Sequence, residues 1–132
     1  MASKFDASDL ASRLAKLPKV VRTNLEKALK SDADEWVRLA RAIAPTDPED
    51  GTPLKDSIRS EATPTGGQIV RAGGKTTTKT TPAGTYDYAV GQEFGTQNMP
   101  ASPFFWTSYR SLRKKFTARR KRALSKAIKE LK

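Results

Sequence analysis

The last 23 residues of the chain, from Arg110 to Lys132, carry almost all of its excess positive charge. They contain eleven lysines and arginines and one acid, Glu130, so ten of the eleven net positive charges lie there. Such a block repels itself unless counter-charge lies nearby, and this constrains how a fold can hold it. A polyanion, an acidic protein surface or an anionic lipid surface would each supply counter-charge. The basic residues that we expect to make this contact are Arg113, Lys114, Arg119, Arg120, Lys121, Arg122 and Lys126.

Three interpretations of this basic segment stay open. A solvated helix face would carry several acids in i,i+4 pairs with the basic residues, whereas this segment has only Glu130, four residues after Lys126. Contact with nucleic acid would neutralise phosphates without reading bases, because lysine and arginine are spread around the helix without Asn or Gln beside them. Docking on an acidic ring of partner protein fits equally well. The late apolar face is thin for membrane binding.

The composition excludes several classes of protein. The chain has 132 residues, which fits a single domain (1–132), and it contains neither cysteine nor histidine. Disulfides and thiolate metal sites are therefore excluded, and the commonest general base is missing. No apolar run approaches the ~20 residues that span a bilayer, and the N-terminus lacks the pattern of a secretory signal. We expect a protein made in a cytoplasm that is not an enzyme, carries no cofactor or metal and contacts no membrane.

Apolar periodicity predicts helices at both ends of the chain. Leucines recur at intervals of four and three in 6–17, and a longer stripe runs from 19 to 44, so that 6–44 is helical as a short helix followed by one long helix or a kinked pair. A C-terminal helix is predicted at 102–131, of which the first half packs on a sheet and the second half extends past the domain. Its buried stripe consists of Phe105, Tyr109, Leu112 and Phe116.

The middle of the chain is predicted to form a turn-rich loop at 45–53 and a small antiparallel sheet within 54–95. Leu54 to Ile58 forms a helical turn, and the strands are short, β-prone and bounded by Gly or Pro. They are Arg59 to Ala62, Gln68 to Ala72 and Tyr86 to Phe94. Between the last two, 73–84 has no apolar anchor and is expected to be a long mobile hairpin loop. The predicted class is α+β, with long N-terminal and basic C-terminal helices packed on the small sheet.

Two acidic clusters and one glycine motif are explained without a ligand. Gly74-Lys75-Thr76 imitates the end of a phosphate-binding loop, but Ile69 stands where that motif requires a glycine. The acids of 47–50 match no calcium-loop spacing. The acids of 32–35 are expected on the outer face of a helix.

An aromatic cluster at the start of the C-terminal helix has two interpretations, a base-stacking surface or a part of the core. Since these residues begin a helix beside the predicted sheet, the core is favoured. The residues are Phe104, Phe105, Trp106 and Tyr109.

Three strings, in order, carry a resemblance to a known family. The first runs from Ala44-Pro45 through Gly51 to Ile58, the second from Tyr88-Ala89 to Glu93-Phe94-Gly95-Thr96, and the third from Met99 to Phe105. In this order and spacing they resemble the small neck or tail-component proteins of long-tailed bacteriophages, the family named for gene product ten of a lambdoid phage. The resemblance covers almost the whole chain.

The resemblance implies a structural virion protein of the head-to-tail junction, acting in the neck, in tail completion or as a tail terminator. It implies a ring of copies, expected to be sixfold, around the DNA path, with adjoining head-closure or tail proteins as partners and the DNA phosphate backbone as a further contact. It implies no catalysis. The residues of the family turn are Glu93, Phe94, Gly95, Thr96, Pro103 and Phe104.

Contacts between subunits are expected at two places. Glu93 would present a carboxylate to an arginine of the neighbour, and the Thr-rich loop would reach a neighbour and become ordered there. The loop residues are Lys75, Thr76, Thr77, Thr78 and Lys79. The alternative function is a nonspecific nucleic-acid-binding protein that uses the same basic helix.

Overall fold

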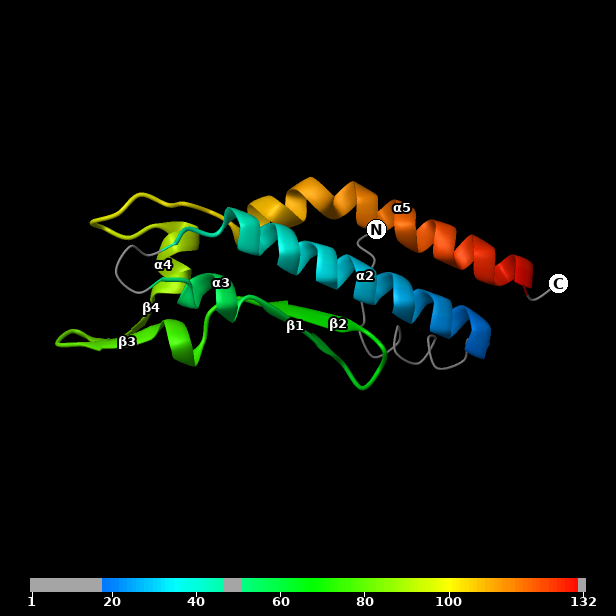
Figure 1. Cartoon of the computed structure of the whole chain (residues 1–132), viewed down its shortest axis with the longest axis horizontal. Helices are drawn as coiled ribbons and strands as arrows, with labels where there is room; N and C mark the ends of the chain where they lie inside the picture. The colour runs from blue at the N-terminus through cyan, green and yellow to red at the C-terminus, as the bar shows by residue number, and fades with distance from the viewer. Residues whose placement is uncertain (1–17, 47–50, 131–132) are drawn as a thin grey trace, which may run out of the picture.

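A computed structural model describes residues 18–46 and 51–130, which form two long helices, three short helical segments and two β-hairpins (Figure 1). The α+β class is confirmed. In chain order the elements are α2 (Lys19–Ile43), α3 (Pro53–Ser57), β1 (Arg59–Ala62), β2 (Gln68–Arg71), η1 (Lys75–Thr77), β3 (Thr78–Thr81), β4 (Gly84–Asp87), α4 (Tyr88–Phe94) and α5 (Phe105–Glu130). The predicted helix 6–17 and the acids of 47–50 lie outside the described residues.

The helix α2 is one continuous helix. Of the two forms expected for 19–44, a single long helix or a kinked pair, the structure has the single helix. It follows Pro18, whose carbonyl accepts the N–H of Arg22, and its last turn closes where Ala44 donates to the carbonyl of Ala40. Ala44 itself is extended, with ψ of 135°, as the residue before a proline prefers. The predicted stop at Pro45 is therefore correct to within a residue.

The two long helices lie side by side and antiparallel, and the β1–β2 hairpin packs on the other side of α2 (Figure 1). The long helices pack on the small sheets as predicted, and Tyr109 and Phe116 of α5 lie near Val70 of β2. The expectation that the second half of α5 extends past the domain is wrong. The main partner of α5 is α2, and burial continues as far as Ala127, which is 0% exposed. The cause is the apolar stripe of α5, where Phe116 is buried, and the buried face of α2, which carries the small residues Ala28 and Ala33.

The strands form two separate two-stranded sheets. In the first, β1 pairs with β2 from Arg59 opposite Arg71 to Ala62 opposite Gln68, so both predicted strands are confirmed to within a residue. The predicted strand Tyr86 to Phe94 is wrong, because only its first two residues are strand and the rest forms α4. Asp87 switches the structure, since its carboxylate accepts the N–H of Ala89 and caps the new helix.

The segment predicted as a mobile loop, 73–84, instead holds the helical turn η1, the strand β3 and the tight turn to β4. Thr77 is 0% exposed, and its hydroxyl donates to Asp87 Oδ1 at 2.6 Å. Gly74, with φ of +130°, donates its N–H to the other carboxylate oxygen at 3.0 Å. A polar anchor therefore fixes the base of this hairpin, although the segment has no apolar one.

The main hydrophobic core joins elements far apart in the sequence. Its buried members come from α2, from the segment after it, from α3 and from the two sides of the turn that leads into α5. They are Val37, Ala40, Ala44, Leu54, Ile58, Ala89 and Phe104.

Candidate functional site

Acids of α2 neutralise part of the basic helix. Arg119 donates to Asp32 Oδ1 and to Glu35 Oε2, both at 2.6 Å, and Lys115 donates to Glu35 Oε1 at 2.5 Å. Arg120 lies 3.9 Å from Asp32. The expectation that Asp32 and Glu35 lie on an outer helix face is wrong for these two, since Asp32 is 7% exposed and both face α5.

The surroundings move the pKa values of these groups in opposite directions. Burial raises the pKa of Asp32, and the hydrogen bond from Arg119 only partly offsets this. The hydrogen bonds from Lys115 and Arg119 lower the pKa of Glu35. The same two carboxylates raise the pKa of Arg119. Arg119 is thus a structural cation that holds the two helices together, and it is not available to an external partner.

Seven other basic residues of α5 have no ion pair within the described part of the chain, and all seven are exposed. We call this set the outer cations. It includes five of the residues predicted to contact a partner, whereas Arg119 and Arg120 belong to the ion-pair cluster with α2. The outer cations are Arg110, Arg113, Lys114, Lys121, Arg122, Lys126 and Lys129.

The carboxylate of Glu93 holds the N-terminus of α5. Its Oε2 accepts the N–H groups of Phe104 and Phe105, both at 2.9 Å, and its Oε1 accepts that of Trp106 at 3.0 Å. Glu93 is 8% exposed and lies eleven residues before the first of these donors. A side chain on α4 therefore does the work of an N-cap, which the apolar Phe104 cannot do. The expectation that Glu93 pairs with an arginine of a neighbour is wrong, because this carboxylate is already occupied.

The rest of the family turn is structural except for one exposed aromatic side chain. Gly95 has φ of +81°, and a Cβ there would lie 2.8 Å from the backbone N of Ala101, so the turn requires glycine. Thr96 closes the turn by pairing with Met99. Phe104 is 1% exposed in the core, while Pro103 is exposed and Phe94 is 68% exposed.

The predicted loop residues lie at the base of the β3–β4 hairpin and divide into two groups. Thr77 is buried and points inward to Asp87, so it is not available to a neighbour. The other four are exposed, and Lys79 Nζ lies over the ring of Tyr88, 5.4 Å from its centroid. These four are Lys75, Thr76, Thr78 and Lys79.

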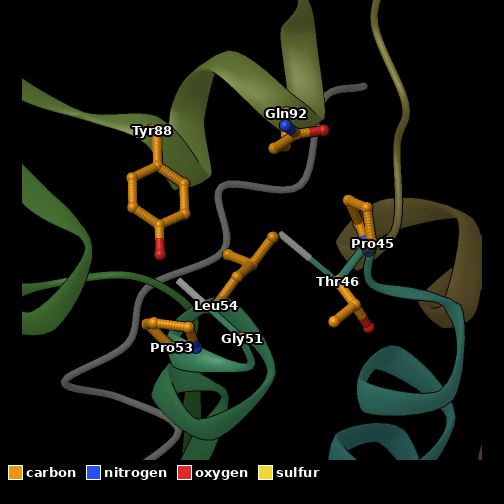
Figure 2. A pocket seen from close by; sticks show the side chains of 7 residues that line it. All are labelled: Pro45, Thr46, Gly51, Pro53, Leu54, Tyr88 and Gln92. Atoms are coloured by element: carbon orange, nitrogen blue, oxygen red, sulfur yellow. The ribbon is translucent and has the colours of Figure 1, made fainter. Parts of the chain in front are cut away.

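A small pocket of about 210 Å³ lies where the first two family strings meet (Figure 2). One wall comes from α3 and the residues beside it, and Tyr88 and Gln92 of α4 supply another. Among the described residues, this lining carries no Asp, Glu, Lys or Arg side chain. Its residues are Pro45, Thr46, Gly51, Pro53, Leu54, Tyr88 and Gln92.

An exposed apolar patch lies beside the start of α5. Val90 and Phe94 are one turn apart on α4 and are 57% and 68% exposed, and Trp106 of α5 is 43% exposed. A groove of about 120 Å³ lies among them, and Ala72 and Phe105 also line it. We call Val90, Phe94 and Trp106 the apolar patch.

Aromatic side chains near the patch serve helix packing. The ring of Trp36 on α2 packs at a tilt against those of Phe105 and Tyr109, with centroids at 4.7 and 4.9 Å. Its Nε1 donates to Ser108 Oγ at 3.0 Å. The prediction that these aromatics belong to the core is confirmed for Phe104, and Phe105 packs partly buried against that core. Tyr109 is partly buried beside Trp36. Trp106 is the exception because it remains partly open to solvent.

Residues 18–46 and 51–130 contain no group of Asp and Glu side chains gathered to hold a metal ion. None of the helices they form combines the length and the apolar character that crossing a bilayer requires.

No family model, no curated protein and no solved structure matches the chain.

Sequence reasoning missed the partners of Arg119 and Glu93. A signal existed for the first: Asp32 and Glu35 are three residues apart, and Lys115 and Arg119 are four apart, so each pair shares one helix face. No comparable signal marked Glu93, because its three donors are backbone N–H groups and Glu93 itself was predicted to lie on a strand.

Proposed function

We propose that this protein is a structural component of the head-to-tail junction of a long-tailed bacteriophage. Copies assemble as a ring, expected to be sixfold, around the DNA path in the neck, in tail completion or as a tail terminator, with adjoining head-closure or tail proteins above and below. It resides in the virion and performs no catalysis.

One observation carries the proposal: the three strings that resemble the neck-protein family meet in one place. Ala44, Leu54 and Ile58 of the first string, Ala89 of the second and Phe104 of the third share one buried core. Residues of the first two strings also line the pocket in Figure 2. Strings whose residues pack together act as one structural unit. This packing supports the view that the three strings form a single family signature and are not three unrelated short matches.

The apolar patch supplies a surface suited to the contact between copies. A ring requires a heterologous interface, in which one face of each subunit meets a different face of the next. Phe94 exposes most of its ring to water, and exposed apolar side chains that lie together mark interaction sites more often than side chains scattered singly. Aromatic side chains such as those of Phe94 and Trp106 are enriched at protein interfaces, where Trp is among the residues that contribute most to binding.

The test is the oligomeric state of the purified protein and of Phe94→Ser, measured by native mass spectrometry and sedimentation over a concentration series. We expect closed rings for the parent protein and monomers for Phe94→Ser. A matched control is Ile69→Ser on β2, which replaces another exposed apolar residue away from the patch and leaves the ring intact. A parent protein that stays monomeric throughout, or a Phe94→Ser variant that still forms rings, contradicts the proposed assembly surface.

The alternative, a nonspecific nucleic-acid-binding protein, is favoured by the outer cations alone. It predicts binding of DNA by a chain that remains a monomer. The oligomer measurement therefore separates the two functions without reference to DNA.

A further inference from the structure

We propose that the outer cations of α5 bind the phosphate backbone of double-stranded nucleic acid without reading its sequence. This interaction goes beyond the proposed ring, because it belongs to the surface of a single subunit and does not require assembly.

The structure divides the charge of α5 into an inner and an outer set. The helix Phe105–Glu130 carries ten basic residues and one acid, and Lys115, Arg119 and Arg120 face the two carboxylates of α2. The seven outer cations form no ion pair among the described residues, and the one acid of α5, Glu130, lies at its last residue. Internal counter-charge therefore explains the inner set and leaves the outer set for an external partner.

The excess of unpaired positive charge is a property of α5 and not of α2, where some exposed side chains form ion pairs with each other. On α2, Lys30 lies 3.5 Å from Asp34 and Arg22 lies 3.0 Å from Glu26, both one turn apart. Pairs of this kind are typical of a solvated helix face. The described part of α5 contains no such pair.

The outer cations have the spacing and reach of a backbone-binding helix. Arg110, Lys114 and Lys121 follow at intervals of four and seven residues, which places them on one face, with the hydroxyls of Ser111 and Ser125 beside them. From Arg110 to Lys129 the set extends over about 28 Å at about 1.5 Å per residue. A duplex of that length carries roughly 16 phosphates, at one charge per about 1.7 Å. Hydroxyl, lysine and arginine groups are those that bind phosphate oxygens.

The chemistry of the face favours nucleic acid over the two other polyanions. A membrane-binding helix needs a continuous apolar face, whereas the exposed apolar side chains of the basic half of α5 are limited to Leu124 and Ile128. A protein interface would need an apolar or aromatic centre, and no aromatic residue follows Phe116, which is buried. The helix contains no Asn or Gln, so it lacks the amide side chains that read adenine.

The test is binding of a random-sequence DNA duplex, measured by fluorescence anisotropy over a salt series, for the parent protein and for the double variant Lys121→Gln, Arg122→Gln. Each phosphate contact contributes about −0.9 to the slope of log K against log salt, so the variant slope is expected to be shallower by about 1.8. At 0.1 M salt this corresponds to about 60-fold weaker binding. The matched control is Lys27→Gln, Arg38→Gln, which removes two exposed cations without ion pairs from α2. It is expected to keep the parent slope.

Several outcomes would overturn the proposal. They are the absence of duplex binding by the parent protein at low salt, an equal loss of slope in the two double variants, and tighter binding of poly-glutamate or of phosphatidylserine vesicles than of DNA. Circular dichroism of both double variants confirms that the fold is retained, as expected for exposed unpaired side chains. If the outer cations act in the single subunit, Phe94→Ser keeps the parent dependence of DNA binding on salt. The experiments therefore distinguish a failure to form rings from a failure to bind DNA.

Discussion

The substitution Glu93→Gln tests how α4 is joined to the start of α5. In the parent protein one buried carboxylate accepts three consecutive backbone N–H groups at 2.9, 2.9 and 3.0 Å. Glutamine has the same length, but it keeps only one oxygen and removes the negative charge. Its amide oxygen still accepts from the N–H groups of Phe104 and Phe105, whereas its NH₂ group then faces the N–H of Trp106, which is left without an acceptor.

The expected loss of stability follows from these two changes. Hydrogen bonds to a charged group contribute about 1.5–3 kcal/mol and neutral ones about 0.5–1.5, and a buried donor without a partner costs about 1–3 kcal/mol. The favourable interaction of a carboxylate with a helix N-terminus, up to about 2 kcal/mol, is lost as well. Since these terms overlap, we expect the free energy of unfolding to fall by about 3 kcal/mol, a large part of the total stability of about 5–15 kcal/mol of a typical domain.

The assay is urea unfolding followed by tryptophan fluorescence, because Trp106 donates to this carboxylate and Trp36 packs against the start of α5. Glu61→Gln is the matched control. Glu61 is 51% exposed and its ion pairs, at 3.5 and 3.7 Å, are long, so its loss should cost less than about 1 kcal/mol. If Glu93→Gln is no more destabilising than Glu61→Gln, the carboxylate does not cap α5 in solution and the reasoning fails.

Two further predictions concern the α2–α5 contact and the β3–β4 hairpin. The pKa of Glu35 is lowered in the folded state, so its stabilising contribution is present above the ordinary value of 4.5 and is lost as pH falls through the folded value. The free energy of unfolding should therefore decline on the acid side of that value. Glu35→Gln should make this decline smaller, and it should lower the free energy of unfolding by about 1 kcal/mol at neutral pH. Identical pH profiles for the two proteins would contradict the ion-pair assignment. Replacing Thr80 to Thr85 by Asn-Gly joins the paired residues Lys79 and Tyr86 and keeps the anchor between Thr77 and Asp87. We expect this variant to unfold with the parent free energy and to fail in ring assembly; rings of normal size in electron micrographs would remove the hairpin from the interface.

Local patterns in the sequence predicted much of the fold. The predicted bounds are correct to within about a residue for α2, for the helical turn at α3 and for the strands β1 and β2. In these segments the residue propensities, the apolar periodicity and the terminating Pro and Gly residues all indicate the same structure. The error at Tyr86 to Phe94 arose where a short apolar run fits either period. Ala89 and Glu93 are both buried and four residues apart, which is the spacing of a helix face, and Asp87 stands where an N-cap is required.

The parts of the site that the sequence did not predict depend on contacts between distant segments. Arg119 meets Asp32 across 87 residues, and Glu93 meets the start of α5 across a turn whose path depends on Gly95. No rule based on spacing within one element links such residues. The sequence predicted that the basic segment needs counter-charge, but it did not predict that the chain itself supplies only part of it.

This partial neutralisation links the stability of α5 to its proposed partner. Like charges one turn apart destabilise a helix by about 0.2–0.5 kcal/mol per pair, and Arg110 with Lys114 and Arg122 with Lys126 are such pairs. Lys115 and Arg119 are also one turn apart, but the carboxylate of Glu35 lies between them and converts repulsion into attraction. Phosphate oxygens would do the same for the outer pairs. A polyanion bound along α5 would therefore also stabilise the helix that binds it, because it removes a repulsion that the free subunit retains.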